Sequence, residues 1–238
     1  MFFFGDDMNC WICGNKADSR EHKFKVSDLK LHVGEISPSK PLFKRPEGTK
    51  AKKIGSAKAK ALKFEPSICQ KCNNETTQPY DRSWETLSKY FSENIEQLEK
   101  ERKWEPEKVF PGSSQKEMLN VQLFFAKIFG CRTVELGINA NLSVLSKSIL
   151  DGTPINRFYL SFGKTPGLSD KERYALETPV EVIENNVTGE MHAAFMFYLV
   201  GQIAIEIIYM PKIDGRPIES AWSPSNRKSK YICYRIID

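Results

Sequence analysis

The sequence lacks an uninterrupted apolar segment that could cross a membrane, and it also lacks an internal repeat. Its longest apolar stretch, residues 193–210, is broken by Gly201, Gln202 and Glu206. A buried pair of strands explains such a stretch better than a transmembrane helix does. The apolar residues 1–4 are followed at once by two acids, which argues against a secretory signal peptide. We therefore expect a soluble, cytoplasmic protein that makes no use of a membrane.

The net charge of +5 belongs entirely to the N-terminal third of the chain. Residues 1–81 contain 15 Lys/Arg and 10 Asp/Glu, whereas the basic and acidic residues of the remainder cancel. A local positive excess favours polyanions such as nucleic acid, because binding releases condensed counterions. The alternative is an ordinary solvated surface. Residues 37–63 are rich in lysine and are expected to form a long basic loop.

Four of the six cysteines form two pairs with a two-residue gap, Cys10/Cys13 and Cys69/Cys72. The tight turn of a CxxC segment brings both sulfurs to the same side, and zinc prefers four such ligands in a tetrahedron. In a chain without a secretory signal this spacing indicates metal rather than disulfides. We predict one structural zinc ion. Cys131 and Cys233 stand alone and are interpreted as buried small hydrophobes.

The rest of the sequence predicts an α+β fold. Residues 24–26 alternate with lysines like a short, half-exposed strand. Helical spacing of apolar residues predicts helices over 82–103 and 114–129, with Gly130 as the C-terminal cap of the second. Strands of a mainly antiparallel sheet, with a turn at Gly201-Gln202, are expected at 158–162, 179–184, 193–200, 203–209 and 231–237.

These elements suggest three regions. A zinc-stapled N-terminal domain is expected at residues 1–81 and a connecting helix at 82–111. A C-terminal α+β domain at 112–238 would recognise, regulate or oligomerise, either with a second copy or with another protein. No motif in that region points to a particular chemistry.

Two short motifs flank the cysteine pairs. Glu21-His22 follows the first pair, and Asn73-Asn74 follows Cys72 directly. The order CxxC, acid-His, CxxC-Asn over residues 8–80 resembles the HNH endonuclease family in its zinc-bearing ββα-metal form. The resemblance covers about a third of the chain.

The resemblance implies a metal-dependent endonuclease that hydrolyses phosphodiester bonds of DNA, in phage defence or a mobile element. It makes His22 the general base, and Glu21 and Asn73 the ligands of a catalytic Mg²⁺ or Mn²⁺, with Asn74 as the alternative if the register slips by one. Histidine has the right ordinary pKa to accept a proton from water near neutral pH. A divalent ion would stabilise the charge that develops on the phosphate.

The sequence departs from the family pattern before the second cysteine pair, where the central Asn is missing from residues 63–68. This departure keeps open a non-catalytic zinc-ribbon module that binds DNA or RNA. A third, weaker alternative is a structural interaction protein. His32 and His192 have no such motif and are assigned to surface or core. Lysines expected to contact nucleic acid are Lys23, Lys50, Lys52, Lys53, Lys58 and Lys60.

Overall fold

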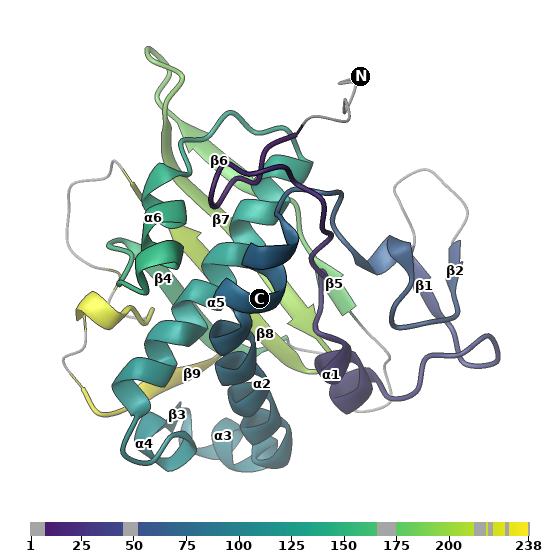
Figure 1. Cartoon of the computed structure of the whole chain (residues 1–238). Coiled ribbons are helices and arrows are strands. Elements are labelled where there is room, and N and C mark those ends of the chain that lie inside the picture. Colours follow the sequence, from purple (N-terminus) through teal and green to yellow (C-terminus); the bar gives the residue numbers. More distant parts are fainter. Residues whose placement is uncertain are drawn as a thin grey trace.

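A β-sheet with helices packed on one of its faces organises the chain (Figure 1). The computed structural model describes residues 8–44, 52–165, 175–211, 218, 221–226 and 229–237. The described helices are α1 (Val26–Asp28), α2 (Gln78–Glu93), α3 (Ile95–Glu101), α4 (Pro106–Val109), α5 (Ser114–Glu135) and α6 (Ser143–Asp151). Single helical turns follow α1 at Leu29–Val33 and precede α2 at Cys72–Thr76, and two further turns lie at Lys60–Leu62 and Pro224–Asn226.

Within the described residues the main sheet has the strand order β3-β9-β4-β8-β7-β5, and β6 pairs with β7. Among the described strand pairs of this sheet, only β4–β9 is parallel. The strands are β3 (Lys103–Trp104), β4 (Phe158–Lys164), β5 (Ala175–Glu177), β6 (Glu181–Glu184), β7 (Met191–Val200), β8 (Ile203–Tyr209) and β9 (Ile232–Ile236). The α+β class and the mainly antiparallel sheet are therefore confirmed.

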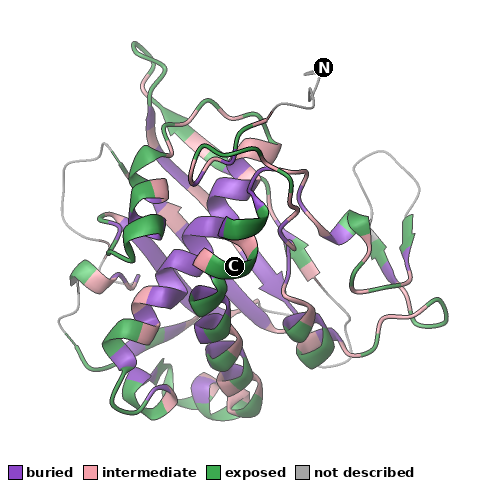
Figure 2. Ribbon diagram, viewed as in Figure 1, coloured by how far each residue is buried: buried purple, intermediate pink, exposed green. Residues whose placement is uncertain are grey.

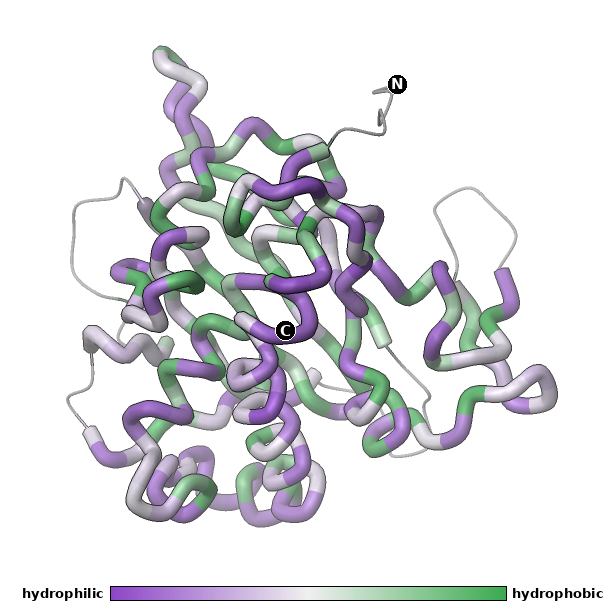
Figure 3. The backbone as a smooth tube through the Cα atoms, in the orientation of Figure 1, coloured by the Kyte–Doolittle hydropathy of each residue, from purple (hydrophilic) through white to green (hydrophobic). Residues whose placement is uncertain are grey.

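The apolar stretch around Gly201 forms the two central strands of this sheet. Val200 pairs with Ile203, so Gly201 and Gln202 make the predicted two-residue turn. Gly201 has φ of 55°, a left-handed conformation that glycine adopts at little cost. In Figure 3 the central strands of the main sheet are drawn largely in green, the colour of hydrophobic residues. Among the described helices none combines the length and apolarity that a bilayer crossing requires.

Two predictions in the N-terminal third are wrong. The half-exposed strand at 24–26 does not form, because Phe24 is buried against the Tyr198 ring and α1 begins at Val26. The expected basic loop contains a two-stranded antiparallel sheet, β1 (Leu42–Lys44) and β2 (Lys52–Ile54). Leu42 and Ile54 are buried within it. This β1–β2 hairpin stands to one side of the main sheet (Figure 1).

Two helix boundaries also differ from those expected. The helix predicted over 82–103 starts earlier, at Gln78, and is interrupted at Asn94 before α3 begins. Gly130 does not end α5, which continues to Glu135. A Cβ atom at position 130 would overlap the ring of Trp11, so glycine here permits close packing of the first cysteine knuckle on α5.

The core between the helices and the sheet is centred on Trp84 of α2, which is fully buried. Its ring contacts those of Phe124 and Phe125 on α5 and of Tyr198 on β7, with centroid distances of 4.7–5.8 Å. Figure 2 shows the buried inner faces of α2 and α5 against the sheet. One cluster of buried side chains includes residues from Cys10 to Tyr234. It therefore contains members from all three regions that we predicted, on both sides of the boundaries at residues 81 and 111. The division into domains stays a prediction.

A buried carboxyl group lies beside this aromatic cluster. Asp28 is 1% exposed, and its Oδ2 accepts hydrogen bonds from Trp84 Nε1 at 2.6 Å and from the Tyr198 hydroxyl at 2.7 Å. Burial raises the pKa of Asp28 to about 6, although these hydrogen bonds oppose the shift. Asp28 therefore links α1, α2 and β7 at an electrostatic cost when it is ionised.

We predict that Asp28→Asn changes the pH dependence of stability. A carboxyl group whose pKa is raised on folding stabilises the fold at low pH, and this contribution is lost as pH rises through about 6. Relative to the variant, the wild type should lose about 1 kcal/mol of unfolding free energy between pH 5 and pH 7. Urea denaturation at both pH values measures this difference, and an identical gap at both would contradict the prediction.

Candidate metal centre and adjacent charged residues

The four paired cysteines converge on one point. The Sγ atoms of Cys10, Cys13, Cys69 and Cys72 all lie within 4.8 Å of one another, and Cys13 and Cys69 are 3.6 Å apart. In a tetrahedral site with Zn–S bonds of about 2.3 Å, sulfurs are separated by about 3.8 Å. The residues therefore fit a zinc ion whose four positions are filled by protein, which is a structural rather than a catalytic arrangement.

Backbone hydrogen bonds bring the two knuckles side by side. In the first knuckle Gly14 N donates to Cys10 O at 2.8 Å, with Gly14 in the left-handed region. In the second, Asn73 N donates to Cys69 O at 3.0 Å as the chain enters the turn before α2. Trp11 N also donates to Ser67 O across the two segments. The cysteine cluster thus joins residues that are more than fifty positions apart in the sequence.

An irregular hairpin of residues 19–24 and 62–68, distinct from the β1–β2 hairpin, connects the knuckles to the rest of the molecule. Ser19 lies opposite Ile68 and His22 opposite Lys63, in antiparallel bridges. Hydrogen bonds flank the His22–Lys63 pair, from Lys23 N to Leu62 O and from Phe64 N to Glu21 O. This pattern places the side chains of His22 and Lys63 next to each other on one face, and those of Glu21 and Lys23 on the opposite face.

Glu21 faces the protein interior. It is 2% exposed, and its Oε2 lies 3.2 Å from Nζ of Lys127 on α5. The same ammonium contacts Asp81 Oδ1 at 2.6 Å and Thr77 Oγ1 at 3.3 Å. Burial alone would lower the pKa of Lys127, but the carboxylates of Glu21 and Asp81 outweigh it and raise the pKa, so the ammonium stays charged.

Lys23, two residues after Glu21, enters a second buried cluster. Its ammonium lies 2.6 Å from Glu135 Oε2 on α5 and 2.5 Å from Glu177 Oε1 on β5. Arg132 contacts the same two carboxylates. Lys23 is 5% exposed, and its ammonium is paired with acids of the fold. We had predicted that this ammonium contacts nucleic acid.

His22 is half-buried, and its Nε2 atom has no hydrogen-bond partner among the described residues. Burial, together with the nearby charges of Lys63 and Lys25, lowers the pKa of His22 to about 4. The imidazole is consequently neutral at physiological pH. Whether it acts as a base stays a prediction.

The two asparagines after Cys72 have different environments. The Asn73 side-chain amide donates to the Ser19 hydroxyl at 2.8 Å, which ties the start of the turn before α2 to the hairpin. Asn74 is exposed. No contact among the described residues joins Asn73 or Asn74 to Glu21, whose ionic partner is Lys127.

The remaining predicted lysines lie on or after the β1–β2 hairpin. Lys50 falls outside the described residues, whereas Lys52, Lys53, Lys58 and Lys60 are exposed.

Cys131 is buried as expected, but Cys233 is exposed on β9. The prediction for Cys233 is therefore wrong, because its side chain lies on the open face of a strand whose alternate residues are buried.

Sequence reasoning missed Lys127, Asp81 and Lys25, which surround Glu21 or contact its partners. Lys25 Nζ lies 2.9 Å from Asp81 Oδ2. One signal was present, since Lys127 is the only charged residue in the run 121–130 of a strongly apolar helix. A lone lysine within an apolar helix must find a buried acid, but the sequence does not say which one.

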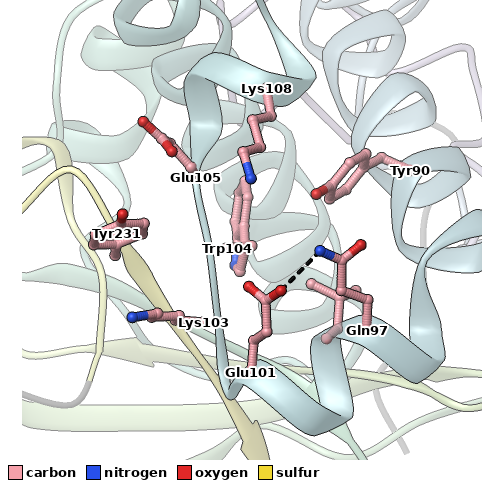
Figure 4. A pocket seen from close by; sticks show the side chains of 9 residues that line it. Tyr90, Gln97, Glu101, Lys103, Trp104, Glu105, Lys108 and Tyr231 are labelled. Atoms are coloured by element: carbon pink, nitrogen blue, oxygen red, sulfur yellow. Dashed lines mark hydrogen bonds between the residues drawn. The ribbon is translucent and has the colours of Figure 1, made fainter.

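The molecule also has a small pocket at the opposite end of the helices, lined by Tyr90, Glu101, Lys103, Trp104 and Tyr231 among others (Figure 4). Trp104 Nε1 is buried there without a hydrogen-bond partner in the described part of the chain. The cavity of about 20 Å³ holds a water-sized molecule only. It offers no alternative to the cysteine cluster as a functional centre.

Comparisons with protein-family models, with curated proteins and with solved structures found no match for this chain. The cysteine cluster and the charged residues next to it are therefore the basis on which a function can be assigned.

We predict that the purified protein contains about one zinc ion per chain and that Cys69→Ser abolishes it. Zinc binding by four thiolates contributes directly to folding free energy, so the variant should also lose its folded core. Elemental analysis and circular dichroism measure the two effects. Cys233→Ser is the matched control, since this exposed cysteine lies outside the cluster and its replacement should leave zinc content unchanged. A metal-free wild type that stays folded would refute the prediction.

Proposed function

We propose that this chain is a zinc-stapled nucleic-acid-binding protein that holds DNA through the lysines of the β1–β2 hairpin. The observation that supports this most directly is the exposure of Lys52 and Lys53 on β2, and of Lys58 and Lys60 just after it, because the β1–β2 hairpin stands apart from the main sheet (Figure 1). Lysine ammonium groups contact phosphates without reading sequence, so binding should be insensitive to base order.

The other lysines of this region support the proposal by contrast. Lys23 and Lys25 form ion pairs with acids of the fold, so their charge is already neutralised. The exposed lysines on and after the β1–β2 hairpin are therefore among those left to attract a polyanion, together with Lys16, Lys30 and Lys71. The zinc cluster would hold the ends of the basic segment at fixed positions beside α2, and fixed positions reduce the entropy lost on binding.

We predict that replacing Lys52, Lys53, Lys58 and Lys60 together with Ala weakens DNA affinity and flattens its salt dependence. The slope of log K against log salt should fall by roughly 0.9 for each phosphate that the protein no longer neutralises. Fluorescence anisotropy with labelled duplex DNA at several salt concentrations measures both quantities.

The matched control removes the same charge elsewhere, from the exposed Lys100, Lys108, Lys116 and Lys147. This variant should keep most of the wild-type slope. A slope reduced equally in the two variants would show that net charge, and not the β1–β2 hairpin, determines binding. A slope unchanged from wild type in both variants would refute DNA binding by lysine.

A second candidate function is phosphodiester hydrolysis of the HNH type, with His22 as the general base. Its support is the neutral imidazole of His22, which lies on the hairpin that follows the first cysteine pair. The His22 Nε2 atom is buried and has no hydrogen-bond partner among the described residues. A nearby phosphate would raise the pKa of His22 from its lowered value, because an anion favours the protonated ring. The adjacent Lys63 is placed to contact the same phosphate.

For this candidate we predict that the wild type cleaves plasmid DNA in Mg²⁺ or Mn²⁺, and that His22→Ala loses cleavage while keeping DNA affinity. General-base catalysis contributes about 10²–10⁴-fold to rate, so a loss in this range is expected. His192→Ala is the control, since His192 lies on β7 and bonds Asn185. Equal cleavage by wild type and His22→Ala, or no cleavage by either, leaves DNA binding as the function and rejects His22 as a base.

A further inference from the structure

Lys127 makes contacts typical of a bound cation. Three oxygen atoms surround its ammonium at 2.6–3.3 Å, from Asp81, Glu21 and Thr77. The residue is fully buried, so these oxygens replace the water that would otherwise solvate the charge. Two carboxylates and a hydroxyl around one point are also ligands that Mg²⁺ and Mn²⁺ accept.

An HNH-type centre requires a divalent ion at Glu21, and the described contacts do not fit one. The Glu21 carboxylate is 2% exposed and is compensated by Lys127. The Asn73 amide nitrogen donates to Ser19, and no contact among the described residues brings its Oδ1 atom, which would bind a metal, to Glu21. A divalent ion next to Glu21 would meet the ammonium of Lys127 at close range, and like charges in a buried site repel strongly.

We infer that the Lys127 ammonium occupies the cation position at Glu21 and thereby keeps a divalent metal away from this carboxylate, which argues against the second candidate function. Lys127 comes from the middle of α5, the helix that packs on α2 and the sheet. Its side chain is fully buried, and its ammonium is held by three oxygen atoms of the protein. Admission of metal would require α5 to move relative to the hairpin.

A second contact restrains the same movement. Lys23, two residues after Glu21, is paired with Glu135, eight residues after Lys127 on α5. Separating Glu21 from Lys127 therefore also separates Lys23 from Glu135. The two ion pairs together hold the hairpin against α5 and keep the Lys127 ammonium at Glu21.

The inference is tested by Mn²⁺ titration of the zinc-loaded full chain, followed by electron paramagnetic resonance. The wild type should show no Mn²⁺ site that Glu21→Gln removes. Lys127→Ala frees the three oxygens and opens space, so it should gain one Mn²⁺ site with affinity about tenfold or more above any wild-type binding. The double variant Lys127→Ala/Glu21→Gln should lose that site.

Lys164→Ala is the matched control, because it removes a lysine from an ion pair with the single carboxylate of Glu99 and should gain no site. A wild-type Mn²⁺ site that depends on Glu21 would overturn the inference, and so would a folded Lys127→Ala variant that gains none. Zinc content reports whether Lys127→Ala is folded, and the comparison of wild type with Glu21→Gln decides the matter if it is not. Because Mn²⁺ binding is read without DNA, its result is independent of the proposed binding function.

Discussion

The buried ion pair between Glu21 and Lys127 is the contact on which the arrangement of this protein depends. It joins a hairpin from the N-terminal third to the central helix of the remainder, at a point where neither side chain reaches solvent. Removing one partner of such a pair costs about 3–5 kcal/mol, because the other charge is left buried. Glu21 and Lys23 carry opposite charges, and so do Lys127 and Glu135, so a shift of the hairpin along α5 would bring like charges together.

The cysteine cluster would fix this hairpin in position once zinc is bound. Residues 8–24 form isolated bridges and turns rather than a regular strand. A zinc ion bound to Cys10 and Cys72 would close the chain on itself and fix the backbone that carries Glu21. Trp11, packed on Gly130, then seats the first knuckle directly on α5. Metal binding, hairpin geometry and the buried ion pair would in this way be coupled.

The sequence predicts those features whose physical cause is local. Alternating and continuous apolar residues mark β7 and β8, and Gly201 marks their turn, so these elements agree with expectation. The CxxC spacing likewise predicts four converging thiols. Lys127 could not be assigned to Glu21, because 106 positions separate them and no local pattern specifies a long-range pair. The β1–β2 hairpin was missed since its lysines hide the two buried positions, Leu42 and Ile54, that stabilise it.

The same structure changes what the positive charge of the N-terminal third means. Counted from the sequence, every lysine there contributes equally to attraction for a polyanion. In the folded chain Lys23 and Lys25 are neutralised by acids that lie far away in sequence or on another element, whereas Lys52 and Lys53 are exposed. Attraction for a phosphate backbone falls off within about 10 Å at moderate salt, so only the exposed set can act on a ligand. The position of each charge in the fold, more than the net charge, therefore determines where a nucleic acid would bind.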